Sequence, residues 1–218
     1  MARLGAALGV SRGGGHRDGT GDEALFNSPT ALLVDPSGLV YVADTGNHCI
    51  RALHPPLDDG PGARFGHGSS DEAARWQVTT VAGTPRRPGD ADGRVEEASL
   101  SFPLALAASP DGALVVADAG NASVRCLLPL PAEAAAGAEV VSPFAELVTV
   151  AGGTRVGPDG LGGRGYLDGP TSKSQFRRPT GLCMLPGTGG CIAVCDETNS
   201  LIRILLQHRT LAHSPPGL

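Results

Sequence analysis

A spacing pattern that recurs three times along the 218-residue chain constrains its fold more than any other feature. Each copy has an Asp-Gly pair, a Pro eleven residues after that Asp, and an Asp-x-x-Asn-x-x-x-Arg motif that starts fifteen, fifteen and seventeen residues after the Pro. The copies are Asp18, Pro29, Asp44, Asn47, Arg51; Asp92, Pro103, Asp118, Asn121, Arg125; and Asp168, Pro179, Asp196, Asn199, Arg203. A period of about 75 residues predicts a repeat architecture with one supersecondary unit per copy.

The first copy has the composition of short strands separated by turns. Apolar and β-branched runs at 30–34, 39–43 and 48–53 are bounded by Asp/Pro/Gly and Asp/Gly/Asn clusters, which favour turns. A fourth run at 78–83 follows a loop, and the second copy repeats it at 147–152. Four antiparallel strands without a helical period predict one β-propeller blade per copy. We expect each Pro to begin an innermost strand and each Asp-x-x-Asn to turn between the second and third strands.

These motifs support a family resemblance. The segments Phe26-Asn27-Ser28-Pro29 and Tyr41-Val42-Ala43-Asp44-Thr45-Gly46-Asn47-His48-Cys49-Ile50-Arg51 resemble the repeats of NHL-repeat β-propellers, especially the long-repeat kind of plant and algal proteins. The second copy departs at Ala122-Ser123, and the third has Val194-Cys195-Asp196 in place of Val-Ala-Asp. The resemblance covers roughly residues 15–206 and implies the fold. It leaves the function open, because the family includes scaffolds, RNA-binding proteins and a few enzymes.

The expected fold is all-β, a partial β-propeller of three NHL-type blades. The blades are expected at residues 15–83, 84–152 and 153–206, the third without its fourth strand, with terminal segments at 1–14 and 207–218. Propellers usually close with four to eight blades. The chain is therefore expected to be either part of a six-bladed propeller or a half-propeller that pairs with a second copy.

Two loops interrupt the repeat, at 54–75 and 129–146, and both join the third and fourth strands of their blade. They are expected on one face, where loops of repeat proteins often bind partners, although insertion without a role is the alternative. The 32 Gly and 18 Pro residues suit the turns of a repeat protein. A net charge of −5 argues against a nucleic-acid partner, and no apolar run is long enough to span a membrane.

The repeated Asp, Asn and Arg are interpreted as structural residues. A catalytic site needs one asymmetric set of groups, whereas these recur in every copy, so no catalytic residue is assigned. We expect each Arg to pair with a turn carboxylate of its own or the adjacent blade, and the Asp-Gly pairs to form inter-blade turns. The innermost strands, at 31–34, 105–108 and 182–185, contain no His, which leaves metal sites and cofactors without support.

The five Cys residues form no Cys-x-x-Cys motif, and Cys191 and Cys195 lie too far apart along a strand to bridge. Reduced, buried thiols and an intracellular, cytoplasmic location are expected, since no clear signal peptide is present. The expected function is a non-enzymatic protein-interaction scaffold, with a homodimer or further blades as partners. The alternatives are a six-bladed propeller hydrolase or lyase with ligands from other blades, or RNA binding through one face. Candidate binding residues are His48 and two pairs interpreted as lying in equivalent inter-blade loops, Arg86, Arg87, Arg177 and Arg178.

Overall fold

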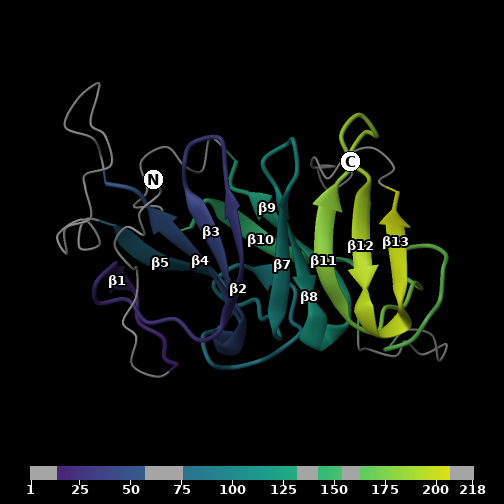
Figure 1. Ribbon diagram of the computed structural model, residues 1–218, viewed down its shortest axis with the longest axis horizontal. Coiled ribbons are helices and arrows are strands. Elements are labelled where there is room, and N and C mark those ends of the chain that lie inside the picture. The colour runs from purple at the N-terminus through teal and green to yellow at the C-terminus, as the bar shows by residue number, and fades with distance from the viewer. Residues whose placement is uncertain (1–13, 57–75, 132–141, 154–162, 207–218) are drawn as a thin grey trace, which may run out of the picture.

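The computed structural model describes residues 14–56, 76–131, 142–153 and 163–206, and these form three antiparallel sheets side by side (Figure 1). The chain is all-β, and the sheets are consecutive blades of a partial propeller, as predicted. Most of the terminal segments 1–14 and 207–218 and of the two predicted loops lies outside the described residues.

The first two sheets each have five strands. The first runs in the order β1-β5-β4-β3-β2, and the second in the order β6-β10-β9-β8-β7. The strands of the first are β1 (Gly19–Thr20), β2 (Pro29–Val34), β3 (Val40–Asp44), β4 (Cys49–His54) and β5 (Gln77–Ala82). Those of the second are β6 (Gly93–Arg94), β7 (Pro103–Ala108), β8 (Leu114–Asp118), β9 (Ser123–Pro129) and β10 (Phe144–Gly152).

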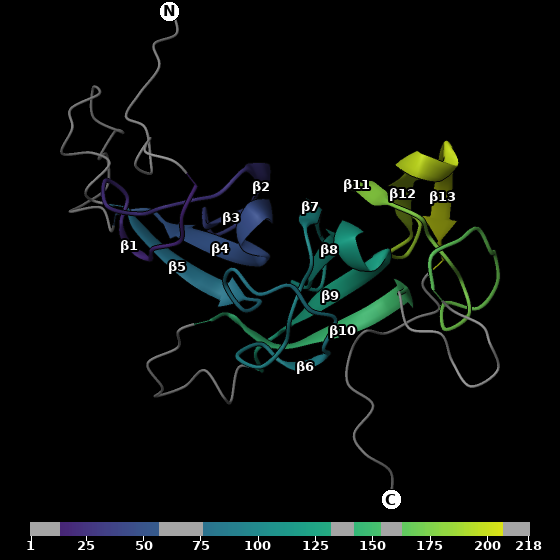
Figure 2. The ribbon, with the colours of Figure 1, turned by 90° about the horizontal axis from the view of Figure 1, so that it is seen from below.

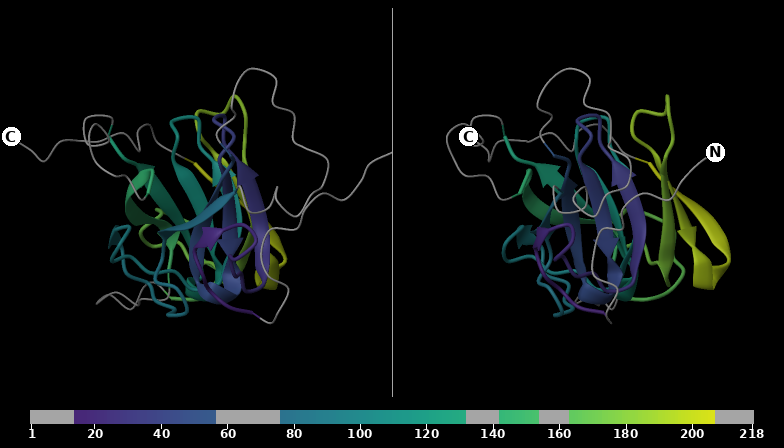
Figure 3. Two further views of the ribbon diagram at one scale, coloured as in Figure 1. Left: turned by 90° about the vertical axis from the view of Figure 1, so that its left-hand side faces the viewer. Right: turned by 60° about the vertical axis from the view of Figure 1, so that its left-hand side comes forward.

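The third sheet has three strands among the described residues, β11 (Pro179–Met184), β12 (Ile192–Asp196) and β13 (Leu201–Leu205). Each Pro of the repeat begins the innermost strand of its blade, and β2, β7 and β11 contact one another in series. The hairpin turns β2–β3, β7–β8 and β11–β12 gather at one end of the molecule (Figures 1 and 3).

A single-turn 3-10 helix lies between the second and third strands of every blade. These turns are η1 (Thr45–Asn47), η2 (Ala119–Asn121) and η3 (Glu197–Asn199). Each ends on a left-handed residue, His48, Ala122 or Ser200. The predicted Asp-x-x-Asn turn is thus confirmed, and the rest of residues 30–53 and 104–128 contains no helix.

Apolar side chains between the sheets hold the blades together. Tyr41 and Ile50 of the first blade and Leu114 and Leu127 of the second enclose Leu100 from the connecting segment. A second cluster joins the second and third blades around Phe176, and a third lies on the outer face of the first blade. Viewed from below, the sheets splay apart with their innermost strands on one side (Figure 2). Each blade is therefore stabilised by the face of its neighbour.

Two boundaries differ from the sequence expectation. The strands β9 and β10 extend to Pro129 and back to Phe144, so they take up both ends of the loop predicted at 129–146. The Asp-Gly pairs are not simple inter-blade turns, because Gly19 and Gly93 begin the short edge strands β1 and β6. Positive φ angles of 134° and 129° at these glycines orient the preceding Asp toward the sheet.

Candidate functional site

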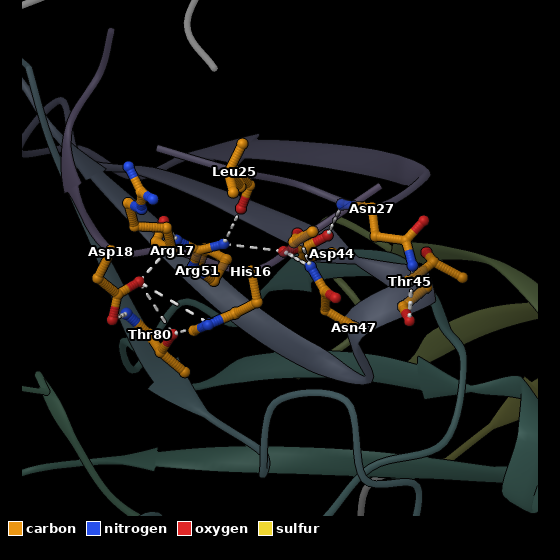
Figure 4. Close-up of polar contacts among 12 residues, drawn as sticks. His16, Arg17, Asp18, Leu25, Asn27, Asp44, Thr45, Asn47, Arg51 and Thr80 are labelled. Atoms are coloured by element: carbon orange, nitrogen blue, oxygen red, sulfur yellow. Dashed lines mark hydrogen bonds and ion pairs between the residues drawn. The ribbon is translucent and has the colours of Figure 1, made fainter. Parts of the chain in front are cut away.

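The repeated Arg of the first blade is the centre of a buried polar network (Figure 4). Arg51 is completely buried and donates to Asp44 Oδ2 at 2.9 Å and to Asp18 Oδ1 at 2.6 Å. Its guanidinium also donates to the carbonyls of Leu25 and Arg17, at 3.0 and 2.8 Å. The Arg therefore joins β4 to the turn of its own blade and to the segment that precedes the blade.

Asp44 and Asn47 complete this network. Asp44 accepts hydrogen bonds from the Asn27 backbone amide at 2.7 Å and from Asn47 Nδ2 at 2.8 Å. The same Asn47 amide group donates to the Gly15 carbonyl at 2.7 Å. All of these partners lie in the first blade or the segment leading into it.

The second blade repeats this geometry. Arg125 donates to Asp118 at 2.9 Å and to Asp92 at 2.6 Å, and Asn121 donates to Asp118 at 2.7 Å. Burial raises the pKa of Asp118 to about 6, since loss of hydration outweighs the hydrogen bonds from Ser101, Asn121 and Arg125 that favour the charged form.

The third blade has a looser version. Arg203 Nη1 lies 3.6 Å from Asp196, against 2.9 Å in the other blades, and Arg203 pairs with the exposed Asp168. Asn199 still donates to Asp196 at 2.7 Å and to the Gly165 carbonyl at 2.8 Å. Every repeated Arg thus pairs with carboxylates of its own blade, which decides between the two alternatives left open by the sequence.

The first Asp of each copy, at 18, 92 and 168, was not assigned a partner from the sequence. The structure makes each one a direct partner of the repeated Arg. The signal that could have identified them is their constant spacing to that Arg in the first two copies. The contact itself depends on the tertiary path of the chain.

His48 lies at the contact between the first two blades. It is 8% exposed, its Nδ1 accepts the Phe102 backbone amide at 3.1 Å, and its ring meets the Phe102 ring edge-on at 4.4 Å. Burial lowers the pKa of His48, and acceptance at Nδ1 requires the neutral form. This geometry places the candidate binding residue in a packing contact.

The two candidate Arg pairs are not in equivalent loops. Arg86 and Arg87 follow β5, whereas Arg177 and Arg178 directly precede β11, a position held by Ser101 and Phe102 in the second blade. All four Arg side chains are exposed. The Arg86 amide donates to the Asn47 carbonyl, and the Arg178 amide to Asp196, so the first pair lies beside η1 and the second beside η3.

The five Cys residues are free, but they are not uniformly buried as expected. Cys49 and Cys126 are completely buried, Cys191 is half-buried, and Cys183 and Cys195 are exposed. The exposed pair lies on the side of the third sheet that faces away from the second blade. Within the described ranges, no three His, Cys, Asp or Glu side chains are grouped as a metal site would require. No helix in the described part of the chain is long and apolar enough to cross a membrane.

Comparisons with known proteins agree with this architecture. The family model for the NHL repeat matches residues 26–53, which confirms the resemblance predicted from the motifs. The chain is 34% identical over 111 residues to Protein SUPPRESSOR OF QUENCHING 1, chloroplastic, of Arabidopsis thaliana, covering 51% of this chain and 9% of that protein. It is 30% identical over 116 residues to Teneurin-3 of Mus musculus, covering 48% of this chain and 4% of that protein.

Solved structures with low sequence identity share the fold. An auxiliary nutrient binding protein from Bacteroides thetaiotaomicron has a TM-score of 0.58 at 18% identity, with 84% of this chain and 38% of that chain covered. A putative phosphatase from the same organism has a TM-score of 0.57 at 17% identity, with 87% of this chain and 36% of that chain covered. The chain therefore spans less than half the length of the structures, and a tenth or less of the length of the two proteins, that it resembles.

Proposed function

We propose that this chain is a non-enzymatic NHL-type propeller segment that serves as a protein-interaction scaffold. The charged residues that the repeat places together are already paired within each blade, and the same set recurs three times. That repetition suits a structural role better than catalysis. The observation that carries the proposal is an apolar sheet face on the third blade that has no neighbour among the described residues.

This open face consists of Cys183, Cys195, Ile202 and Ile204. Ile202 and Ile204 are 67% and 48% exposed. The corresponding residues of the second blade are completely or almost completely buried, and these are Ala107, Ala117, Val124 and Cys126. Ala107, Val124 and Cys126 belong to the cluster that joins the second blade to the third. The third blade therefore presents the same kind of surface that the preceding blade buries, and surfaces of this kind drive association.

The first blade carries the complementary surface. Leu32 and Val34 on β2 are 69% and 62% exposed. Their counterparts in the third blade, Leu182 and Met184, pack against the second blade. The segment that leads into the first blade packs Ala24 and Phe26 on the outer face of that blade. The first blade of a second copy therefore presents an outer face that can pack against the open face of the third blade.

The proposed occupant of the open face is thus a second copy of this chain. Two copies joined head to tail give six blades, within the range of closed propellers. The two-fold operation makes both contacts equivalent, so each copy contributes one open face and one first-blade face to the ring.

Light scattering during size-exclusion chromatography tests the proposal. We expect a dimer from the parent chain, and monomers from Ile202→Lys and from Val34→Lys, because each substitution places a charge in both contacts. Mixing the two variants should restore dimers, since a mixed ring keeps one unaltered contact. Asp111→Lys, on the exposed β7–β8 turn, is the matched control and should remain dimeric. A well-folded parent that stays monomeric at micromolar concentration would overturn the proposal.

A further inference from the structure

The end of the molecule opposite the hairpin turns carries exposed arginines. The second strand of each blade runs from its hairpin turn to its η turn, so the η turns lie at this opposite end (Figure 1). Four exposed arginines lie in the segments beside these turns, and they are Arg86, Arg87, Arg164 and Arg177. The adjacent Arg178 pairs with Glu197, but none of the four has a carboxylate partner among the described residues.

Contacts between the first two blades join Arg86 to an aromatic residue. The Arg86 backbone amide donates to the Asn47 carbonyl in η1 at 2.8 Å. The next residue, His48, accepts the Phe102 backbone amide at 3.1 Å and meets the Phe102 ring edge-on at 4.4 Å. The first arginine pair and Phe102 therefore lie on either side of the same η turn.

Contacts between the second and third blades continue this surface. The Gly120 amide in η2 donates to the carbonyl of Ser101, the residue before Phe102, at 2.7 Å. The Arg164 guanidinium donates to the Gly120 carbonyl and, at 3.3 Å, to the Arg177 carbonyl. One continuous surface thus has arginines on both sides of Phe102.

Phe102 is unusual at its position. It is 50% exposed, and its φ angle of 50° is costly for a bulky residue. The counterparts that precede the repeated Pro in the other blades are the polar residues Ser28 and Arg178. The contact with His48 holds the Phe102 ring in place but leaves half of the residue open to solvent. An exposed ring fixed in this way is suited to contact a partner.

The charge of this surface indicates which partner fits. Guanidinium groups without carboxylates bind acidic groups through charge-assisted hydrogen bonds. The two groups of arginines are separated by one blade, roughly 10 Å, which is about three residues of an extended chain. A nucleic acid fits less well, because the chain has a net charge of −5 and successive bases would need further stacking rings.

We propose that the arginine surface, formed by Arg86, Arg87, Phe102, Arg164 and Arg177, binds an extended acidic segment of a partner protein. Carboxylates of the segment pair with the arginines on both sides, and an aromatic side chain between them packs on the Phe102 ring. The surface lies within one chain, so the proposal is independent of the dimer.

Isothermal titration at low salt with the peptide acetyl-Glu-Asp-Phe-Asp-Glu-amide tests the site. We expect a Kd on the order of 0.1 mM. Added salt should weaken binding, because exposed ion pairs are screened. The same peptide with Ala in place of Phe should bind about fivefold more weakly, since the contact between rings is lost. The peptide with Lys at all four acidic positions should not bind.

Variants of the protein locate the site. Arg177→Glu should weaken binding about tenfold, because an attraction is replaced by a repulsion. Arg94→Glu is the matched control, with the same change of charge on the edge strand β6, and should bind as the parent does. Phe102→Gly should weaken binding about fivefold and keep the urea midpoint of the parent, because glycine adopts this φ angle without strain.

An oligouridylate of the same net charge distinguishes a nucleic-acid partner. Tighter binding of the oligouridylate than of the acidic peptide would assign the surface to nucleic acid and overturn the proposal. The proposal is also overturned if the parent binds the lysine peptide as well as the acidic one, or if Arg177→Glu and Arg94→Glu bind the acidic peptide equally.

Discussion

Each blade pairs the guanidinium of its repeated Arg with one buried and one exposed carboxylate. Removing a charged group from water is costly, and the cost is offset only when the partners satisfy most of its hydrogen bonds. Arg51 and Arg125 meet this condition with four acceptors each, two of them carboxylates and two backbone carbonyls. The carbonyls belong to the segment that leads into the blade, so the network fixes the path of an otherwise irregular stretch of chain.

Arg125→Ala is expected to lower the free energy of unfolding by about 3 kcal/mol, because Asp118 then remains buried without its ion partner. Urea titration measures the change. The control is Arg94→Ala, whose side chain is 75% exposed and pairs with Glu96 only at 3.5 Å. Exposed pairs of this kind contribute little, so the control should match the parent. If the two variants were equally stable, the repeated Arg would have no structural role.

His48 gives the stability a pH dependence. Its pKa is lowered in the folded state, so its contribution is present above the unfolded value of about 6.5 and is lost as the pH falls through the folded value. His48→Asn keeps an acceptor and tolerates the left-handed backbone but does not titrate. Between pH 7.5 and 5.5 the parent should lose more stability than this variant, as measured by urea titration. Parallel pH profiles would contradict the role of the neutral ring.

Among the strands, a glycine lets the end of the last strand of a blade approach the backbone of the η turn closely. The last strand of each full blade ends beside the η turn, where Gly83 directly follows β5 and Gly152 ends β10. A Cβ atom at Gly83 would lie 2.6 Å from the His48 carbonyl oxygen and 3.0 Å from Cys49 Cα. Both neighbours are backbone atoms, so they cannot move aside as a flexible side chain would.

Gly83→Ala should therefore destabilise the fold by about 2 kcal/mol or more, through the contact and the positive φ together. Gly38→Ala is the matched control, because φ is 90° there and 87° at Gly83, while nothing lies within 4 Å of the added methyl. The control should cost about 1 kcal/mol from the backbone alone. Thermal unfolding compares the two variants. Equal losses of stability would mean that the close approach of Gly83 to the backbone of His48 and Cys49 makes no contribution.

The main strands were predictable because their apolar runs are bounded by strong turn formers. The edge strands β1 and β6 were not, since two residues are too short to show a period of alternation. The positions of Arg86 and Arg177 were not predictable for a similar reason, because an Arg-Arg pair in a loop has no strand pattern of its own. Arg86 follows the last strand of its blade, whereas Arg177 precedes the first strand of the third blade. An open face on the third blade could be expected from the blade count. Which residues form it, such as Ile202, follows only from the register of β12 and β13.

Asp90, Ser123, Arg125 and Thr149 line a cavity of the second blade that could not be predicted from the shared pattern. The repeats differ at Asp90 and Ser123, and such positions have no repeated spacing. The sheet pairing brings Thr149 opposite Arg125, which the sequence alone does not show. Differences between blades are thus the better guide to a site, and agreement between blades to the fold.

Across the whole molecule, the fold depends on the stacking of blades. The second blade is covered on both sides, and its residues Val115, Val116, Ala117 and Val124 are completely buried. The third blade is covered on one side in the described structure. We expect the third blade to associate through its open face, and the cysteines of this chain can report on that association without an engineered label.

Thiol labelling at increasing protein concentration is the most direct test. Cys183 and Cys195 lie on the open face, and the counterparts of Cys195, Ala43 and Ala117, are completely buried. Cys191, at the β11–β12 turn on the far end of β12, is the internal control. Burial raises the pKa of Cys126 to about 12, so this thiol should stay unreactive throughout. We expect Cys195 to react at nanomolar protein concentration and to become protected as dimers form, while Cys191 reacts at the same rate at every concentration. A constant labelling rate at Cys195 up to the highest soluble concentration would rule out association through the open face.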